Sequence, residues 1–249
     1  MKISAVIITL NEEAIIAKTL SQLSFCDEII IIDSGSTDNT LLICKSYNCI
    51  VYHRAFDGYG NQKNFGFEQA KNDWILNIDA DEVLTNNLKN EIMNLCNVDN
   101  VAAFKINRKT VFLEKEMHFS GLRTEYVLRL LHKKKCSWNN SLVHEKLIVQ
   151  GNIKSLKNAI LHYTAKDENL FILKNIKYAE KAAKQMFEQN KNAFYGEAYF
   201  RKYIKFIEIF ILKFGFLDGK YGWKWARIMS NYTFQKYSTL EELLRNAKS

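Results

Sequence analysis

Three carboxylates close an apolar run in Trp74-Ile75-Leu76-Asn77-Ile78-Asp79-Ala80-Asp81-Glu82. No charge precedes Asp79 in this run, which predicts a buried strand over 74–78. Alternation along a strand sends Asp79 and Asp81 to the same side of the backbone. Carboxylates this close repel each other unless a positive group lies between them. A hard divalent cation bound to a phosphate meets this requirement, because Mg²⁺ and Mn²⁺ prefer one or two carboxylates plus substrate oxygens.

Strand and helix patterns alternate before this segment. Strands are predicted over 2–10, 28–33 and 50–53, and helices over 12–23, 40–47 and 61–71. The alternation predicts a parallel, three-layer α/β/α arrangement. Ligands of such sheets bind beyond the carboxyl ends of the strands, where Thr9, Asp33 and the Asp79/Asp81 pair lie. Three converging polar strand ends favour a nucleotide-diphosphate site more than any one of them does.

The pattern changes after Asp81. Strands predicted over 101–112 and 126–132 indicate a mixed sheet, and helices are predicted over 168–190, 195–214 and 223–246. We therefore expect a catalytic α/β domain over 1–165 and a helical C-terminal extension over 166–249. The extension holds 16 Lys and Arg against 9 Asp and Glu, which is almost the whole net charge of +8. This asymmetry favours an anionic partner.

Several classes of protein are disfavoured by composition. No uncharged apolar stretch of about 18 residues occurs, so no transmembrane helix is expected. The start, Met1-Lys2-Ile3-Ser4, leads directly into a predicted strand, so no signal peptide is expected. The five cysteines include no CxxC pair, which favours reduced thiols in a cytoplasmic protein and argues against a zinc site.

Three motifs in order resemble family 2 glycosyltransferases of the GT-A fold. They are Val6-Ile7-Ile8-Thr9-Leu10-Asn11-Glu12, Ile32-Asp33-Ser34-Gly35-Ser36-Thr37-Asp38 and Asp79-Ala80-Asp81-Glu82. Three later segments are similar to the subgroup with the β-1,4-glucosyltransferases of the lipopolysaccharide inner core: Leu142-Val143-His144-Glu145, Leu161-His162-Tyr163 and Phe214-Gly215-Phe216-Leu217-Asp218-Gly219. The resemblance covers essentially the whole chain. It implies inverting, metal-dependent transfer of a hexose, expected to be glucose, from a UDP-sugar to a lipid-linked saccharide.

The resemblance also implies a donor-binding set. Its members are Thr9, Leu10, Asn11, Glu12, Asp33, Lys63, Asp79 and Ala80. Asp33 is expected on the uracil or ribose, and its alternative role is to stabilise the turn at Gly35. Lys63 is expected near the diphosphate, and its alternative is a solvated lysine on a helix face. Asn11 and Glu12 have the cap of the first helix as their alternative, and Ser36 or Thr37 is the expected cap of the second.

The metal, Mg²⁺ or Mn²⁺, is expected on Asp81 and Asp79, with His162 completing its ligands by resemblance. Taken alone, Asp79 and Asp81 are more typical of acids at the start of a helix over 84–96, and the neighbouring Asp33 and Thr9 favour the metal site instead. Taken alone, His162 is more typical of a satisfied core residue.

Inversion at the sugar carbon requires one general base that deprotonates the acceptor hydroxyl. Glu145 is the candidate by resemblance and Glu82 is the alternative, while a surface acid beside Lys146 is the simpler interpretation of Glu145. Arg123 and Arg129 are candidates for contact with phosphate or acceptor. Their simpler interpretation is a salt bridge to Glu125.

The helical tail combines basic and aromatic residues over 199–206 and 209–214. Such helices lie on anionic bilayers, so we expect peripheral contact with the inner face of the cytoplasmic membrane and a glycolipid acceptor. The alternative is that this stripe packs on the catalytic domain with its lysines snorkelling. A nucleotidyltransferase would need a glycine-rich loop where 9–13 has no glycine, and a nucleic-acid binder would leave the strand-end acids unexplained. No nucleic-acid partner is expected.

Overall fold

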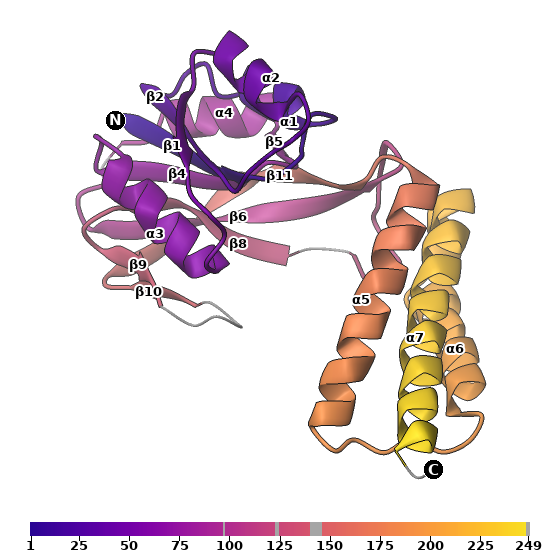
Figure 1. Ribbon diagram of the computed structural model, residues 1–249. Coiled ribbons are helices and arrows are strands. Elements are labelled where there is room, and N and C mark those ends of the chain that lie inside the picture. Colours follow the sequence, from indigo (N-terminus) through magenta and orange to yellow (C-terminus); the bar gives the residue numbers. More distant parts are fainter. Residues whose placement is uncertain (97, 123–124, 140–145, 248–249) are drawn as a thin grey trace. The chain divides into compact units, whose positions relative to one another are not determined.

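The computed structural model describes residues 1–96, 98–122, 125–139 and 146–247 (Figure 1). The chain forms two compact units. The first comprises Met1–Lys109 with Thr124–His162, and the second comprises Thr110–Arg123 with Tyr163–Ser249. Residues 110–123 therefore group with the C-terminal helices, although the sequence pattern alone gives no sign of this.

One sheet has the strand order β3-β2-β1-β4-β8-β6-β11-β5. The strands are β1 Ile3–Thr9, β2 Glu28–Asp33, β3 Ile50–His53, β4 Trp74–Asp79, β5 Glu82–Leu84, β6 Val101–Phe112, β7 Lys115–Glu116, β8 Glu125–His132, β9 Cys136–Trp138, β10 Leu147–Val149 and β11 Asn152–Ala165. β3, β2, β1 and β4 are parallel, whereas β8 joins β4 and β6 antiparallel, and β5 joins β11 antiparallel. The predicted mixed sheet is confirmed.

Helices cover both faces of the parallel half of the sheet (Figure 1). In the first unit they are α1 Ile16–Ser21, α2 Thr40–Ser46, α3 Tyr59–Gln69 and α4 Asn86–Met93. Because side chains alternate along a strand, Ile7 joins an apolar cluster with α1, α2 and α4, whereas Val6 joins a second cluster with α3. Gly66 lets α3 approach β1, since a Cβ there would overlap the Val6 side chain. The predicted α/β fold with three layers is confirmed.

The predicted helix caps are wrong. Asn11 has a φ of 56°, and its Oδ1 accepts a hydrogen bond from the Thr37 amide at 2.8 Å. Helix α1 begins only at Ile16, without a side-chain cap. Ser36 does not cap α2 either, because its hydroxyl donates to Asp33. These residues instead join the loop after β1 to the loop after β2.

The second unit is helical, with α5 Glu168–Glu188, α6 Glu197–Ile207, the π-helix η1 Glu208–Leu212, the 3-10 helix η2 Gly215–Asp218 and α7 Lys220–Asn246. Its core includes the packed rings of Phe112, Phe171 and Trp225. The predicted helix over 195–214 is thus interrupted by η1, and it ends where Phe214 takes a φ of 56°. Within the described ranges, no helix has the length and apolarity needed to cross a membrane.

Candidate active site

The register of the parallel strands brings the predicted polar strand ends together. Thr9 at the end of β1 is the partner of Asp33 at the end of β2. On the other side of β1, Ile8 is the partner of Asp79 at the end of β4. The three strand ends therefore lie side by side at one edge of the first unit, as the alternating pattern predicted.

Asp33 anchors the turn that follows β2. Its side chain is fully buried, and its carboxylate accepts hydrogen bonds from the Gly35 and Ser36 amides and from the Ser36 hydroxyl. The Nδ1 atom of His53 lies 3.3 Å from Asp33 Oδ2. The turn-stabilising role of Asp33 is therefore real, and a further contact to a nucleotide would add to it.

The loop after β1 is fastened to the loop after β2. The Asn11 amide donates to Ser36 Oγ at 2.9 Å, and the Glu12 amide donates to Thr40 Oγ1 at 2.8 Å. Leu10, the first residue after β1, is exposed. Thr9 is buried, and among the described residues its hydroxyl has no hydrogen-bond partner.

Glu82 and Asp79 share one buried arginine. Arg129 Nη2 lies 2.6 Å from Asp79 Oδ2 and 2.7 Å from Glu82 Oε1. Glu82 is fully buried and also accepts the Asp79 amide at 3.1 Å. The positive group that the acids require is therefore supplied in part by Arg129 and not only by a metal ion. The simpler interpretation of Arg129, a salt bridge to Glu125, is wrong, because Glu125 pairs with Arg108.

Positive charge keeps Asp79 ionised. Burial acts to raise the pKa of Asp79, but Arg129, followed by Lys63, outweighs burial and holds this pKa below its ordinary value. Lys63 itself is buried, with Nζ 4.2 Å from the centre of the Trp138 ring. The alternative of a solvated Lys63 is therefore wrong, because α3 carries its side chain under β9 and toward the acids.

Arg108 is a site residue that the sequence pattern did not reveal. Its Nη1 atom lies 3.3 Å from Glu82 Oε1, while its Nη2 atom lies 2.5 Å from the exposed Glu125. A signal was present for Arg129, because an arginine within the apolar run of β8 must find acidic partners once it is buried. The sequence contains no comparable signal for Arg108, which lies where β6 is only half-buried.

Asp81 meets His162 through strand pairing. In the antiparallel pair of β5 and β11, His162 lies opposite Glu82, next to Asp81 in the chain. The Nε2 atom of His162 lies 3.2 Å from Asp81 Oδ2, and the two side chains are 23% and 31% exposed. His162 is thus not a core residue. The acids are not helix caps either, because β5 intervenes and Thr85 caps α4 by accepting the Leu88 amide.

This donor set fits a divalent cation that is also held by a phosphate. Asp81 and His162 offer a carboxylate oxygen and an imidazole nitrogen, both partly exposed to solvent, and Asp79 ends β4 two residues before Asp81. In the part of the chain that the structure describes, no group of three or more His, Cys, Asp or Glu side chains is close enough to hold a metal ion alone. Further ligands would therefore come from a substrate, as is usual for Mg²⁺ beside diphosphates.

Replacing Asp79 with asparagine should flatten the acid side of the stability profile. A carboxyl group whose pKa is lowered by folding stabilises the protein above its unfolded pKa, and this contribution is lost as pH falls through the folded pKa. Below about pH 4, the free energy of unfolding in urea should therefore fall less steeply in Asp79→Asn than in the native protein. The difference should be small, since 41% of the Asp79 side chain is exposed and screened by solvent. Identical slopes would contradict the ion pair.

The predicted base, Glu145, lies outside the described residues, as do His144 and Arg123. Ala80 is described, and its carbonyl accepts the Thr19 hydroxyl at 2.7 Å, which ties the loop before β5 to α1. The predicted alternative base, Glu82, is enclosed by two arginines. This environment favours a role in holding Arg129 and Asp79 over proton transfer.

Comparison with known proteins gives consistent matches. The family model described as "Glycosyl transferase family 2" matches residues 4–147. A lipopolysaccharide core biosynthesis glycosyltransferase, LpsC of Rhizobium meliloti, is 29% identical over 96% of this chain and 94% of its own length. An uncharacterized glycosyltransferase of Rickettsia felis is 30% identical over 100% of this chain and 92% of its own length.

Two solved structures are also similar. TarS of S. aureus, in complex with UDP-GlcNAc, is 14% identical over 99% of this chain and 92% of its own, with a TM-score of 0.47. Glucosyl-3-phosphoglycerate synthase from Mycobacterium tuberculosis is 24% identical over 45% of this chain and 44% of its own, with a TM-score of 0.35. The family model spans more than half of the chain and includes the strand ends at Thr9, Asp33 and Asp79, so the chain belongs to glycosyl transferase family 2 and is a glycosyltransferase.

Proposed function

We propose that the protein is an inverting, metal-dependent enzyme that moves a hexose, specifically glucose, from a UDP-sugar to a lipid-linked saccharide such as the lipopolysaccharide inner core. The observation that carries the donor half is the approach of Asp81 to His162 at 3.2 Å, beside the strand ends of Asp79 and Asp33. The acceptor half is supported by the name of the Rhizobium meliloti relative and by the basic C-terminal helices.

The donor site is proposed to divide into a nucleoside end and a diphosphate end. Thr9, Leu10, Asn11 and Asp33 hold the uridine through the two fastened loops. At the diphosphate end, Asp81 and His162 hold the metal ion, and Lys63 adds positive charge next to Asp79. When bound, the cation stabilises the charge that grows on the departing diphosphate. An imidazole ligand favours Mn²⁺, because Mg²⁺ takes oxygen ligands.

Arg129 is proposed to organise this end of the site. By neutralising Asp79 and Glu82, it allows Asp81 to approach without three carboxylates repelling one another. Its burial also fixes the side chains in place, because a buried guanidinium with two acidic partners has little freedom to move. Glu82 is then a positioning residue, and Glu145 is the proposed base.

The first test is a panel of UDP-sugars scored for thermal stabilisation with Mn²⁺, with Mg²⁺ and with a chelator. We expect UDP-glucose with Mn²⁺ to raise Tm most, because a ligand that binds only the folded state stabilises it by mass action. ADP-glucose and GDP-mannose are the controls that test whether the protein prefers uracil as the nucleobase of the donor. No response to any nucleotide sugar with either metal would overturn the proposal, and a response to nucleoside triphosphates alone would favour a nucleotidyltransferase.

A second test separates the two candidate bases. Glu145→Gln should bind the donor normally and lose transfer by about 10²–10⁴-fold, because a general base contributes about that much. The loss should persist at saturating acceptor. Retained transfer in Glu145→Gln would move the base to Glu82 or to a group of the acceptor. Transfer to a soluble glycan or a peptide as readily as to a glycolipid would replace the proposed acceptor with one of those classes.

A further inference from the structure

Helix α6 exposes its apolar face. Phe200, Tyr203, Ile204 and Ile207 are between 46% and 65% exposed, and their spacing places them along one side of the helix. We call these four residues the apolar stripe. The opposite side of α6 packs on α7 through residues such as the buried Ala198. A stripe of this kind normally faces a core, so its exposure indicates that something covers it in the working protein.

The stripe continues into an apolar turn. This turn, residues 211–217, includes Ile211, Leu212, Phe214 and Leu217, which are between 53% and 68% exposed. Between the two features, the half-buried rings of Phe206 and Phe210 pack on the core of the second unit, with centroids 5.4 Å apart, and the Phe210 and Phe216 centroids lie 6.4 Å apart. The stripe and the turn thus follow each other along the chain over 200–217.

The apolar turn is held rigidly. Asp218 is buried at its end, and its carboxylate accepts the amides of His118 at 3.0 Å and Phe119 at 3.1 Å and the Ser120 hydroxyl at 3.0 Å. A Cβ on Gly222 would overlap the carbonyl oxygen of Gly215, so these two segments touch backbone to backbone. The large apolar side chains are thus presented outward by fixed backbone.

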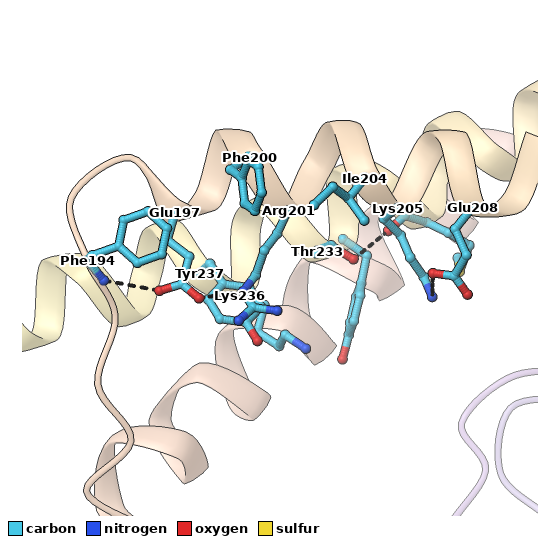
Figure 2. Close-up of a pocket in the computed structure, with 12 residues that line it drawn as sticks. Phe194, Glu197, Phe200, Arg201, Ile204, Lys205, Glu208, Thr233, Lys236 and Tyr237 are labelled. Carbon is cyan, nitrogen blue, oxygen red and sulfur yellow. Dashed lines mark hydrogen bonds and ion pairs between the residues drawn. The ribbon is translucent and has the colours of Figure 1, made fainter.

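A cationic groove opens beside the stripe. The groove, of about 480 Å³, lies between α6 and α7 and is lined by Phe200 and Ile204 of the stripe (Figure 2). Arg201, Lys205 and Lys236 supply its positive charge. Arg201 is paired with Glu197, and Lys205 is paired with Glu208.

Lys236 is the cation of the groove that calls for an external anion. The Tyr232 and Tyr237 ring centroids lie 5.7 Å and 5.0 Å from its Nζ atom, and among the described residues no acid pairs with it. Burial, then Arg201 and Lys205, lower its pKa. An anion bound in the groove would offset the repulsion between Lys236 and the neighbouring Arg201 and Lys205.

We propose that α6, η1 and η2 form a surface that docks on an anionic bilayer, with the stripe and the apolar turn among the lipid chains and the groove cations on lipid phosphates. Residues 197–218 hold four Lys and Arg against three acids, one of which is the buried Asp218, and Lys236 of α7 adds a further positive charge at the groove. Cations next to exposed aromatic and aliphatic side chains match the phosphates and acyl edge of a membrane interface. The purpose of this contact rests on the proposed function, since it would bring the sugar site to a lipid-linked acceptor.

The test is sedimentation of the full-length protein with phosphatidylglycerol/phosphatidylcholine vesicles and with phosphatidylcholine vesicles, without nucleotide. We expect binding to the anionic vesicles that weakens with salt. Leu212→Ser with Leu217→Ser should weaken it by about tenfold or more, because two apolar side chains leave the bilayer. The matched control is Leu170→Ser with Leu173→Ser on α5, since these leucines are equally exposed in the same unit but lie outside the proposed surface.

Lys236→Gln tests the groove independently of the leucines. Its binding to anionic vesicles should fall about fivefold, since one basic residue near such a surface contributes about 1 kcal/mol. Lys181→Gln on the exposed side of α5 removes the same charge elsewhere and should have little effect. Circular dichroism establishes that each variant is folded.

The proposal is overturned if the native protein stays in the supernatant with anionic vesicles, or if the α5 control loses as much binding as the paired leucine variant. It is also overturned if the paired leucine variant binds vesicles normally but loses self-association, which would make the surface a contact between copies. Donor binding is measured separately by thermal stabilisation. Vesicle binding without any response to UDP-sugars would thus contradict the proposed function and still support the membrane-docking surface.

Discussion

Asp81→Ala should lower glycosyl transfer by about a thousandfold, because removal of a group that stabilises charge in the transition state costs about 10²–10³ in rate. Asp81 is the carboxylate that lies 3.2 Å from His162, whereas Asp79 and Glu82 are already paired with Arg129. Among these three acids, Asp81 is the one that pairs with a histidine in the described part of the chain. We therefore expect the loss of Asp81 to remove most of the affinity for the metal.

Metal binding is a readout of the same site that does not depend on activity. We expect Asp81→Ala to abolish Mn²⁺-dependent stabilisation by UDP, and His162→Ala to raise the Mn²⁺ concentration required for it by at least about 10–100-fold, since even residues that only support a metal ligand have effects of that size. Asp73→Ala is the control, because Asp73 is an exposed acid of the same unit that pairs with Lys134. Undiminished Mn²⁺ dependence in Asp81→Ala would contradict the assignment.

The strand ends were predictable because their signals are local. Each of β1, β2 and β4 is a mainly apolar run that ends in a polar residue. Because ligands bind at the carboxyl ends of parallel strands, these polar residues are expected at one binding site. Thr9, Asp33 and Asp79 could therefore be grouped before any contact was known.

The contact between Asp81 and His162 could not be derived from pattern. It depends on the pairing of β5 with β11, and β5 is only three residues long. A strand this short carries no alternation to read, and its partner lies far along the chain. Only the family resemblance pointed to His162. The predicted caps of α1 and α2 were wrong for another reason. The side chains of Asn11 and Ser36 form hydrogen bonds between the two loops and do not cap a helix.

Arg129→Met should destabilise the protein by about 3–5 kcal/mol, which is the cost of leaving one partner of a buried ion pair alone. Glu82 is fully buried, and it would keep only Arg108 at 3.3 Å and the Asp79 amide. The measurement is the free energy of unfolding in urea at neutral pH. Methionine fills a similar volume, so lost packing contributes little to the expected change.

Two further variants make this prediction specific to the pair. Arg129→Met with Glu82→Gln should recover part of the loss, because the buried negative charge is removed together with its partner. Arg108→Met should cost less than Arg129→Met, since Glu82 then keeps Arg129 at 2.7 Å, and the other partner of Arg108, Glu125, is 62% exposed. If Arg129→Met cost less than about 1 kcal/mol, or no more than Arg108→Met, Arg129 would not be the group that allows three acids to gather at this strand end.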